Sequence, residues 1–357
     1  MFCKNNQVKN WGEERKEQES IMNPTIKDVA ELVGVHPSTV SRVINDDSRI
    51  SEKTREKVFL IIKKLGYTPN AIARGLKTKR THTLGMLIPD ITNPFFAEIA
   101  RGVEDAANKN DFNIILCNTD DRLKKERTYL EILRGKRVDG LILGTAHIKD
   151  KSILELEKNN FPYILVSRNI EELDKNCVIV DDEAGGIMAT EYLIKLGHRR
   201  IAHITGPLKI RSALNRLKGY KLALKKYGIE YRDELVGEGD FRIKGGYQVM
   251  KRFLKLAEPP TAIFAANDLL ALGAMQAIQK KNFHIPEDFS VIGFNDIELA
   301  SFVYPALTTI RQPMLEMGAL AVKMLLRIIE EGEFNQRKIV LKPKLIIRES
   351  CKKINKI

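Results

Sequence analysis

Residues 25–77 read TIKDVAELVGVHPSTVSRVINDDSRISEKTREKVFLIIKKLGYTPNAIARGLK, and this stretch decides how the N-terminal part of the chain folds. Thr25 is a good helix N-cap, and Asp28, three residues later, completes a pair that resembles a capping box. Gly34 ends the predicted helix. The apolar residues between the cap and Gly34 recur at helical spacing, which gives the helix one buried face: Ile26, Val29, Ala30 and Val33.

A second helix is predicted to run from Pro37, which suits the first helical position, to about Asn45. We expect Val40 to face inward, together with Val43 or Ile44. Because the turn between the two helices contains a glycine, they form a predicted helix-turn-helix.

Two further helical segments are predicted downstream. The first is capped by Ser51 and ended by Gly66, and it turns four apolar residues inward: Val58, Ile61, Ile62 and Leu65. The second lies between residues 67 and 80 and is opened by Pro69 and Asn70. A helix this short is not stable alone in water, so we expect it to need a second copy of the chain, DNA, or both.

Positive charge is concentrated in this region. The 357-residue chain has a net charge of +13, and residues 22–80 contain twelve Lys and Arg against six Asp and Glu. Such asymmetry indicates a polyanionic partner, although a solvated basic face would carry the same charge. The short polar side chains of the second helix favour DNA.

From residue 83 onward, short apolar strands alternate with amphipathic helices. The strand-like runs are LGMLIP, NIILCN, GLILG, YILVS, CVIV, RIAHITG, AIFAAN and SVIGF. Strands of this kind belong to parallel sheets covered by helices on both faces. Eight of them fit two doubly wound lobes better than one sheet, and a closed eight-stranded barrel is the alternative.

Composition excludes several other classes of protein. The chain has no apolar run long enough to span a membrane, and its N-terminus lacks the apolar core of a signal peptide, so we expect a cytoplasmic protein. The four cysteines are scattered and predict neither disulfides nor a zinc site. We expect no metal, no cofactor and no enzyme activity, since GEGDFR lacks the third glycine of GxGxxG and no P-loop or HExxH is present. His198 and His203 are expected to pack rather than bind metal.

Taken together, the motifs resemble those of the LacI/GalR family of bacterial transcription regulators. They are TIKDVAELVGV-x-x-STVSRVIN, YTPNAIARGLK, NPFFAEIARGVE, GHRRIAHITGP, NDLLALGAMQAI, VIGFND and PALTTIRQP, in the family's order over residues 23–350. The resemblance implies an α-helical helix-turn-helix headpiece, a hinge helix and an α/β effector domain. That domain has two lobes, like a periplasmic sugar-binding protein, and the chain crosses between them near residues 180, 310 and 340.

The expected domain boundaries follow from these motifs. Residues 1–21 are a disordered extension, or Met22 is the true start. The other segments are a headpiece over 22–67, a hinge and linker over 68–81, an effector-binding and dimerisation domain over 82–350, and a tail over 351–357. Within the effector domain, we expect an N-lobe of residues 82–180 and 311–338 and a C-lobe of residues 181–310 and 339–350. Without a C-terminal leucine-heptad tail, we expect a dimer, with its seam on the helices after NPFF and RQPM.

The second helix is expected to read the major groove of DNA through its early side chains. Arg42 has the fork needed for a guanine, while by resemblance Pro37 and Ser38 are the positions that vary specificity. The resemblance also places Leu76 of the hinge as a wedge in the minor groove, which kinks the duplex. The predicted DNA-binding residues are Thr25, Pro37, Ser38, Thr39, Ser41, Arg42, Asn45, Lys57, Asn70, Ala73, Leu76 and Lys77.

Ligands of open parallel sheets bind beyond the carboxyl ends of the strands, and polar residues follow those ends here. The predicted effector-binding residues are Asn93, Phe95, Phe96, Ser212, Asn215, Arg216, Asn267, Asp268 and Asn295. Amides, an arginine and aromatic faces suit a polyhydroxylated sugar. Either Phe95 or Phe96 could instead be core, and one of Asn267 and Asp268 is expected to cap a helix.

Three positions depart from what the family usually has. His36 stands in place of the more usual serine cap, and Asn295 in place of a frequent aspartate. Ile210 stands where the purine-responsive member has its ligand arginine, which argues against a purine.

The sequence therefore predicts a DNA-binding regulator, most simply a homodimeric repressor of a carbohydrate-utilisation operon. Its operator would be pseudo-palindromic and its effector a small sugar or sugar phosphate, and the protein would lie on the nucleoid when bound. The alternatives are a global carbon regulator that responds to a phosphorylated carrier protein, a regulator with a non-sugar effector, and a transport-type sugar-binding protein.

Overall fold

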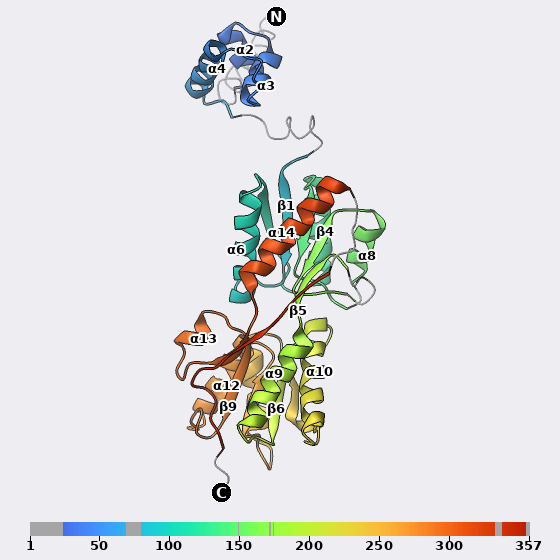
Figure 1. Cartoon of the computed structure of the whole chain (residues 1–357), viewed down its shortest axis with the longest axis vertical. Helices are drawn as coiled ribbons and strands as arrows, with labels where there is room; N and C mark the ends of the chain where they lie inside the picture. Colours follow the sequence, from blue (N-terminus) through green and yellow to red (C-terminus); the bar gives the residue numbers. More distant parts are fainter. Residues whose placement is uncertain are drawn as a thin grey trace, which may run out of the picture. The chain divides into compact units, whose positions relative to one another are not determined.

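The computed structural model describes residues 24–68, 80–148, 150–170, 173, 175–332 and 338–354. The chain divides into two compact units, Met1–Thr81 and His82–Ile357, and each is described by itself (Figure 1). We call the first the headpiece and the second the effector unit.

The headpiece consists of α2 (Ile26–Val33), α3 (Pro37–Ile44) and α4 (Glu52–Leu65), as the sequence predicts. Its core contains Val29, Ala30, Val40, Val43, Val58 and also Tyr67, which lies beyond the last predicted core position. Gly34 and Gly66 end α2 and α4 with φ of 75° and 63°, a conformation that glycine adopts at little cost.

The effector unit contains two sheets, each six-stranded within the described residues. The N-lobe sheet has the order β11 (Lys338–Leu341), β5 (Cys177–Val180), β4 (Tyr163–Val166), β3 (Gly140–Leu143), β1 (Thr83–Ile88) and β2 (Asn113–Asn118). The C-lobe sheet has the order β12 (Lys344–Ile346), β10 (Thr308–Arg311), β9 (Ser290–Asn295), β8 (Ala262–Ala265), β6 (Ile201–Thr205) and β7 (Val236–Glu238). Among the described strands, only the β10–β12 pair is antiparallel. The strands form two separate sheets and not one closed sheet, so the barrel alternative is wrong.

Helices cover both faces of each sheet, and each lobe therefore has an apolar cluster on either side of its strands. The N-lobe helices are α6 (Pro94–Asn108), α7 (Leu123–Gly135), α8 (Lys151–Lys158) and α14 (Met314–Glu331). The C-lobe helices are α9 (Asp182–Lys195), α10 (Arg211–Lys226), α11 (Ile243–Phe253), α12 (Asp268–Gln279) and the short α13 (Leu299–Phe302), with a 3₁₀ turn at Asp233–Leu235. No described helix is long and apolar enough to cross a bilayer.

Two details differ from the expected boundaries. We expected the C-lobe to resume at residue 339, but β11 pairs with β5 in the N-lobe sheet as far as Leu341, so the last crossing, expected near residue 340, follows that residue. The described part of the tail is docked on the C-lobe, because Ile354 N donates to Leu196 O at 2.8 Å and Lys352 O lies 3.2 Å from the His198 ring. His198 and His203 both pack inside this lobe, the latter stacked on Phe264 with ring centroids 4.4 Å apart.

Three pairs of helices cross with their backbones in direct contact: α6 with α14, α9 with α10, and α11 with α12. Each partner places a glycine at the crossing, where a Cβ atom would overlap a backbone carbonyl of the other helix: Gly102 and Gly318, Gly186 and Gly219, Gly246 and Gly273. These crossings fix the helix positions more tightly than apolar side chains alone.

We predict that Gly318→Ala destabilises the effector unit by about 1–3 kcal/mol, because the added methyl would collide with the Ile99 carbonyl. Gly135→Ala is the matched control, since nothing lies within 4 Å of a Cβ there, and it should be neutral or stabilise by up to about 1 kcal/mol. Calorimetric unfolding of the full chain measures both. Equal unfolding free energies for the two variants would contradict the account of the crossings.

Candidate DNA-reading surface and effector cleft

The predicted DNA-reading residues of the headpiece lie on its surface. Thr25, Ser38, Arg42, Asn45 and Lys57 are exposed, and the other three described ones are half-buried: Pro37, Thr39 and Ser41. The remaining candidates, Asn70, Ala73, Leu76 and Lys77, lie outside the described residues.

Local hydrogen bonds hold the helix starts of the headpiece. The Thr25 backbone N–H donates to Asp28 Oδ2 at 2.6 Å, and bonds from Thr25 lower the pKa of that carboxyl. His36 caps α3, since its Nδ1 accepts from the Ser38 N–H at 3.3 Å and lies 2.8 Å from Ser38 Oγ. The imidazole thus replaces a serine cap.

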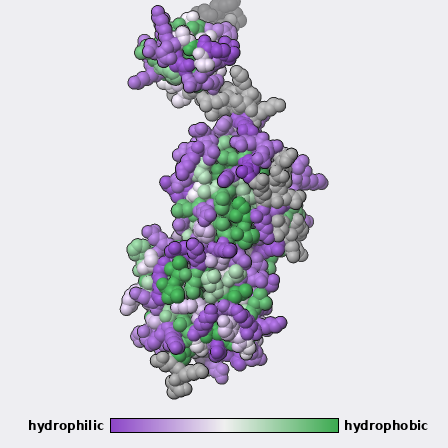
Figure 2. Space-filling model, in the orientation of Figure 1, coloured by the Kyte–Doolittle hydropathy of each residue, from purple (hydrophilic) through white to green (hydrophobic). Residues whose placement is uncertain are grey.

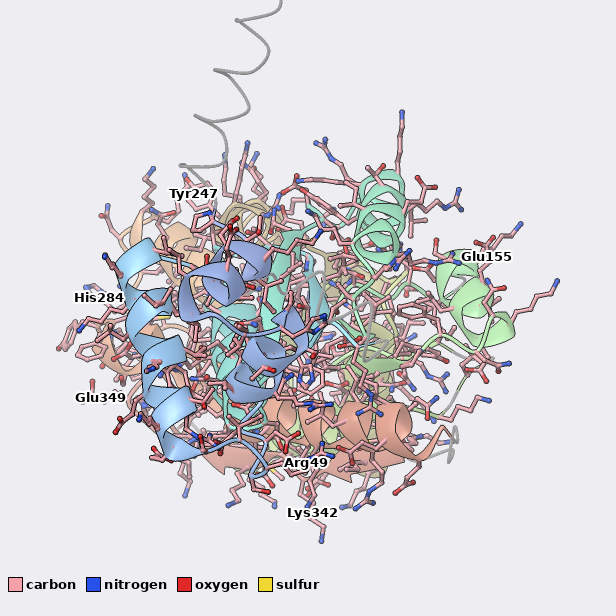
Figure 3. All side chains as sticks on the ribbon, turned by 90° about the horizontal axis from the view of Figure 1, so that it is seen from above. Arg49, Glu155, Tyr247, His284, Lys342 and Glu349 are labelled. Atoms are coloured by element: carbon pink, nitrogen blue, oxygen red, sulfur yellow. The ribbon has the colours of Figure 1, made fainter. Side chains whose placement is uncertain are left out.

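Ion pairs fix the turn between α3 and α4. Arg49, labelled in Figure 3, pairs with Asp47 at 2.6 Å. Arg55 of α4 pairs with Asp46. The turn therefore holds two of the basic side chains of the headpiece against carboxylates, whereas Arg42 projects from the exposed side of α3.

A cleft of about 730 Å³ separates the two lobes at the carboxyl ends of their strands. Seven of the nine predicted effector residues line it: Asn93, Phe95, Phe96, Ser212, Arg216, Asn267 and Asn295. Asn215 does not, because it precedes Arg216 by one residue on α10 and points to a different side of that helix. Asp268 does not either, because it is fully buried beneath the cleft.

The N-terminus of α6 forms part of the N-lobe wall. Asn93 caps this helix, with its Oδ1 accepting from the Phe95 N–H at 3.1 Å. Phe95 and Phe96 meet edge to face, with ring centroids 5.0 Å apart. Both rings belong to the apolar core of the lobe and also line the cleft, so the two roles weighed for them are not exclusive.

Arg168 is a buried cleft residue that our sequence reasoning missed. Its NH1 group donates to Asp121 Oδ1 at 2.8 Å and to Thr145 O at 3.1 Å. Burial alone would raise the pKa of Asp121, but the hydrogen bond from His147 and the charge of Arg168 outweigh it and hold the pKa well below its usual range. The signal available in the sequence was the position of SRN directly after the buried strand YILV.

Arg216 is the corresponding buried arginine of the C-lobe. Its Nε and NH2 groups each lie 2.8 Å from Asp182 Oδ1, and its guanidinium lies 3.8 Å from the centre of the Phe294 ring. Burial raises the pKa of Asp182, while the charge of Arg216 acts in the opposite direction. A carboxylate on α9 therefore positions the arginine of α10.

Three further polar residues of the C-lobe are fixed by the protein itself. Asn267 caps α12, since its Oδ1 accepts from the Leu270 N–H at 2.9 Å. Asp268 accepts from Thr309 Oγ1 at 2.5 Å and from the Ile297 N–H at 2.9 Å, and burial raises its pKa to about 7. Asn295 Oδ1 accepts from Gln312 Nε2 at 2.7 Å. Of the Asn267–Asp268 pair, the asparagine is the cap.

Ion pairs bridge the cleft from lobe to lobe. Asp90 pairs with Arg242 at 3.0 Å, and Asp121 pairs with Lys209 at 3.2 Å. The Ile148 N–H also donates to Lys209 O at 3.1 Å. Each ion pair has an arginine or lysine that is more than half exposed, so solvent screens them and each contributes about 0–1 kcal/mol.

Comparison with known proteins identifies both parts of the chain. The family model for bacterial regulatory proteins, lacI family, matches residues 25–70, and the model for a periplasmic binding protein-like domain matches residues 190–351. The ribose operon repressor of Escherichia coli K12 is 42% identical over 332 residues, covering 92% of this chain and 99% of that protein. The chain belongs to the LacI family of bacterial transcription regulators.

Other LacI-family relatives have the same extent. Catabolite control protein A of Priestia megaterium is 39% identical over 334 residues, covering 93% of this chain and 100% of that protein. The lac repressor dimer bound to operator and an anti-inducer is 31% identical with a TM-score of 0.84, covering 92% and 99% of the two chains. A LacI-family regulator of Enterococcus faecium with bound ribose is 35% identical with a TM-score of 0.69, covering 76% of this chain and all of that one.

Family membership fixes the class of activity. LacI-family proteins are DNA-binding transcription regulators and not enzymes, and they respond to small-molecule effectors. A regulator of this family works on DNA in the cytoplasm. Among the described side chains, no three of His, Cys, Asp and Glu are grouped as metal ligands would be.

The Asp182–Arg216 pair gives a prediction for stability. Asp182→Asn should lower the free energy of unfolding by about 3–5 kcal/mol, because it leaves a buried guanidinium without a counter-charge. The double variant Asp182→Asn/Arg216→Met should recover most of that loss. Asp181→Asn is the control: Asp181 caps α9 through the Ala184 N–H, and asparagine caps equally well. Urea unfolding measures all three variants. A double variant that is no more stable than Asp182→Asn would contradict the buried pair.

Proposed function

We propose that this protein represses genes for the use of a carbohydrate, and that a small sugar or sugar derivative bound in the cleft controls its affinity for an operator. The cleft carries this proposal, because residues of both lobes line it and the same chain has a helix-turn-helix. A ligand that contacts both lobes favours one lobe arrangement over another, and this preference can be linked to DNA binding.

A homodimer on a pseudo-palindromic operator fits this function. Figure 2 shows apolar side chains gathered on one face of the effector unit, over α14 and beside α13. The exposed large residues at these elements are Leu299, Phe302, Tyr304 and Leu315, and Tyr304 is 88% exposed. A second copy of the chain covering this face would bury them, and two headpieces would then meet two half-sites on the nucleoid.

Within the headpiece, we propose that α3 enters the major groove and that Arg42 reads a guanine. Residues 68–81 would form the hinge, with Leu76 inserted at the minor groove of the operator centre. This part of the proposal rests on the sequence motif, because residues 69–79 lie outside the described structure.

Ribose is the reference sugar for the cleft, because relatives are named for the ribose operon and one was solved with ribose. Likeness to catabolite control protein A supports a second candidate, in which a phosphorylated carrier protein acts as the signal. Selecting the operator from random DNA, then titrating operator binding with sugars or with the carrier, separates the two. Repression without any response to sugars would contradict the first proposal.

We predict that Arg42→Ala weakens binding to the selected operator by about 1–3 kcal/mol and relaxes specificity at one base pair, because a bidentate contact is lost. Lys57→Ala, on the exposed face of α4, should weaken binding to all sequences alike and lower the slope against salt by about 1. Fluorescence anisotropy with operator and scrambled duplexes measures both. If both variants lose the same sequence specificity and show the same dependence on salt, the assignment of Arg42 to a base and of Lys57 to a phosphate is wrong.

A further inference from the structure

The buried polar groups of the cleft are mostly hydrogen-bond donors. The carbonyl oxygens of the Asn93 and Asn267 side chains accept from the backbone N–H groups of Phe95 and Leu270, as helix caps. Those N–H groups can only donate, so the orientation of both amides is fixed. Each asparagine therefore keeps its NH2 group on the side away from the cap. One N–H of Asn267 already donates to Phe241 O at 3.0 Å, which leaves its other N–H for a ligand.

Asn295 likewise presents an N–H donor. Its side-chain oxygen accepts from Gln312 Nε2 at 2.7 Å, and this leaves its NH2 group for a ligand. The residue is 4% exposed and lines the cleft. A third amide thus has N–H donors for the ligand, while its oxygen is already engaged by Gln312.

Two buried guanidiniums add further donors. A guanidinium has five N–H groups and no acceptor. Within the described chain, Arg168 donates only through NH1, to Asp121 and Thr145, so its Nε–H and second NH2 group remain. Arg216 has N–H groups left beyond its bonds to Asp182 and Ala266. Both arginines line the cleft and are at most 5% exposed.

Among the described lining residues, the acidic side chains are more exposed than the donors. None of the buried residues that line the cleft is a carboxylate; the four lining carboxylates are partly or fully exposed: Asp90, Asp120, Asp121 and Asp240. Each already accepts from protein donors. Asp90 is bound by Thr92 and Arg242, and Asp120 by Lys125 and Asn118. Asp121 is bound by Arg168 and His147. Asp240 accepts from the backbone N–H of Arg242. Of the buried lining groups, the hydroxyls of Ser167 and Ser212 can still accept.

Helix orientation adds to the positive potential. The helices α6, α10, α11 and α12 contribute residues near their N-termini to the lining, such as Asn93, Ser212, Ile243 and Asn267. The N-terminal end of a helix carries a partial positive charge and favours anions. The buried arginines and this orientation act in the same direction.

On the proposed function above, we propose that the effector is an anionic sugar derivative whose carboxylate or phosphate binds between Arg168 and Arg216. A neutral sugar brings several hydroxyl protons into the cleft, and each needs an acceptor, whereas most of the buried polar groups of the lining offer donors. An unpaired buried donor costs free energy. A carboxylate or phosphate brings only acceptor oxygens, which match the free N–H groups, and arginine binds both in a bidentate manner.

Matched sets of ligands test the proposal on the full-length protein. Isothermal titration at a fixed ionic strength compares D-ribose with D-ribonate and D-ribose 5-phosphate, and D-glucose with D-gluconate and D-glucose 6-phosphate. We expect at least one anion to bind at least tenfold more tightly than its neutral parent. The carboxylate and phosphate arms tell the two kinds of anion apart.

Asn295→Asp supplies a buried carboxylate, which the described lining lacks. This substitution should weaken binding of the preferred anion at least tenfold, because it replaces a donor by a negative charge. The ratio of the affinity for the anion to the affinity for its neutral parent should fall. Asn282→Asp is the control, since it makes the same chemical change at an exposed position after the far end of α12. That variant should keep the preference of the unmodified protein.

The proposal is overturned if no anion in either set binds more tightly than its neutral parent. It is also overturned if Asn295→Asp leaves the preference unchanged. Operator binding by the ligand-free protein is measured separately. Its absence would contradict the proposed regulatory function, whereas its presence with a neutral effector would contradict only the assignment of charge.

Discussion

Contact between the backbones of paired helices is the constraint on which the effector unit depends. Where α9 crosses α10, and in the two equivalent pairs, a glycine on each helix leaves no room for a Cβ atom. The helices cannot slide there without collision, so their N-terminal ends keep fixed positions at the cleft. The cap Asn93, the arginine Arg216 and the cap Asn267 take their places from this packing. A preorganised site of this kind loses little entropy when a ligand binds.

The contacts between the lobes are of a different kind. The pairs Asp90–Arg242 and Asp121–Lys209 are partly exposed, and such pairs contribute little net free energy. Each lobe is therefore rigid, whereas the arrangement of the two lobes depends on ion pairs that each contribute little free energy. In the proposed complex, a ligand held by Arg168 from one lobe and Arg216 from the other would outweigh these ion pairs. This difference in strength is what allows a small molecule to control DNA binding, since a ligand shifts an equilibrium only through its unequal affinity for the two states.

Local pattern was enough to predict the helices of the headpiece and the eight apolar strands, because helix caps, terminal glycines and buried strands depend on neighbouring residues. Seven of the nine residues predicted for the effector also line the cleft. The missed features depend on distant partners. Arg168 becomes a cleft residue only because Asp121, from another loop, holds it there. Asp268 is removed from the lining by Thr309, which lies on the unpredicted strand β10. That strand and β7 are short and partly polar, so neither has the apolar run by which the others were recognised.

We propose that an effector controls operator binding through the cleft between the lobes. The most direct test of this proposal is the operator dissociation constant of the Asp182→Asn/Arg216→Met double variant, measured with and without a saturating amount of the ligand that binds the unmodified protein most tightly. We expect unchanged operator affinity in the absence of ligand and loss of the response to ligand. A full response in the double variant would contradict the proposal.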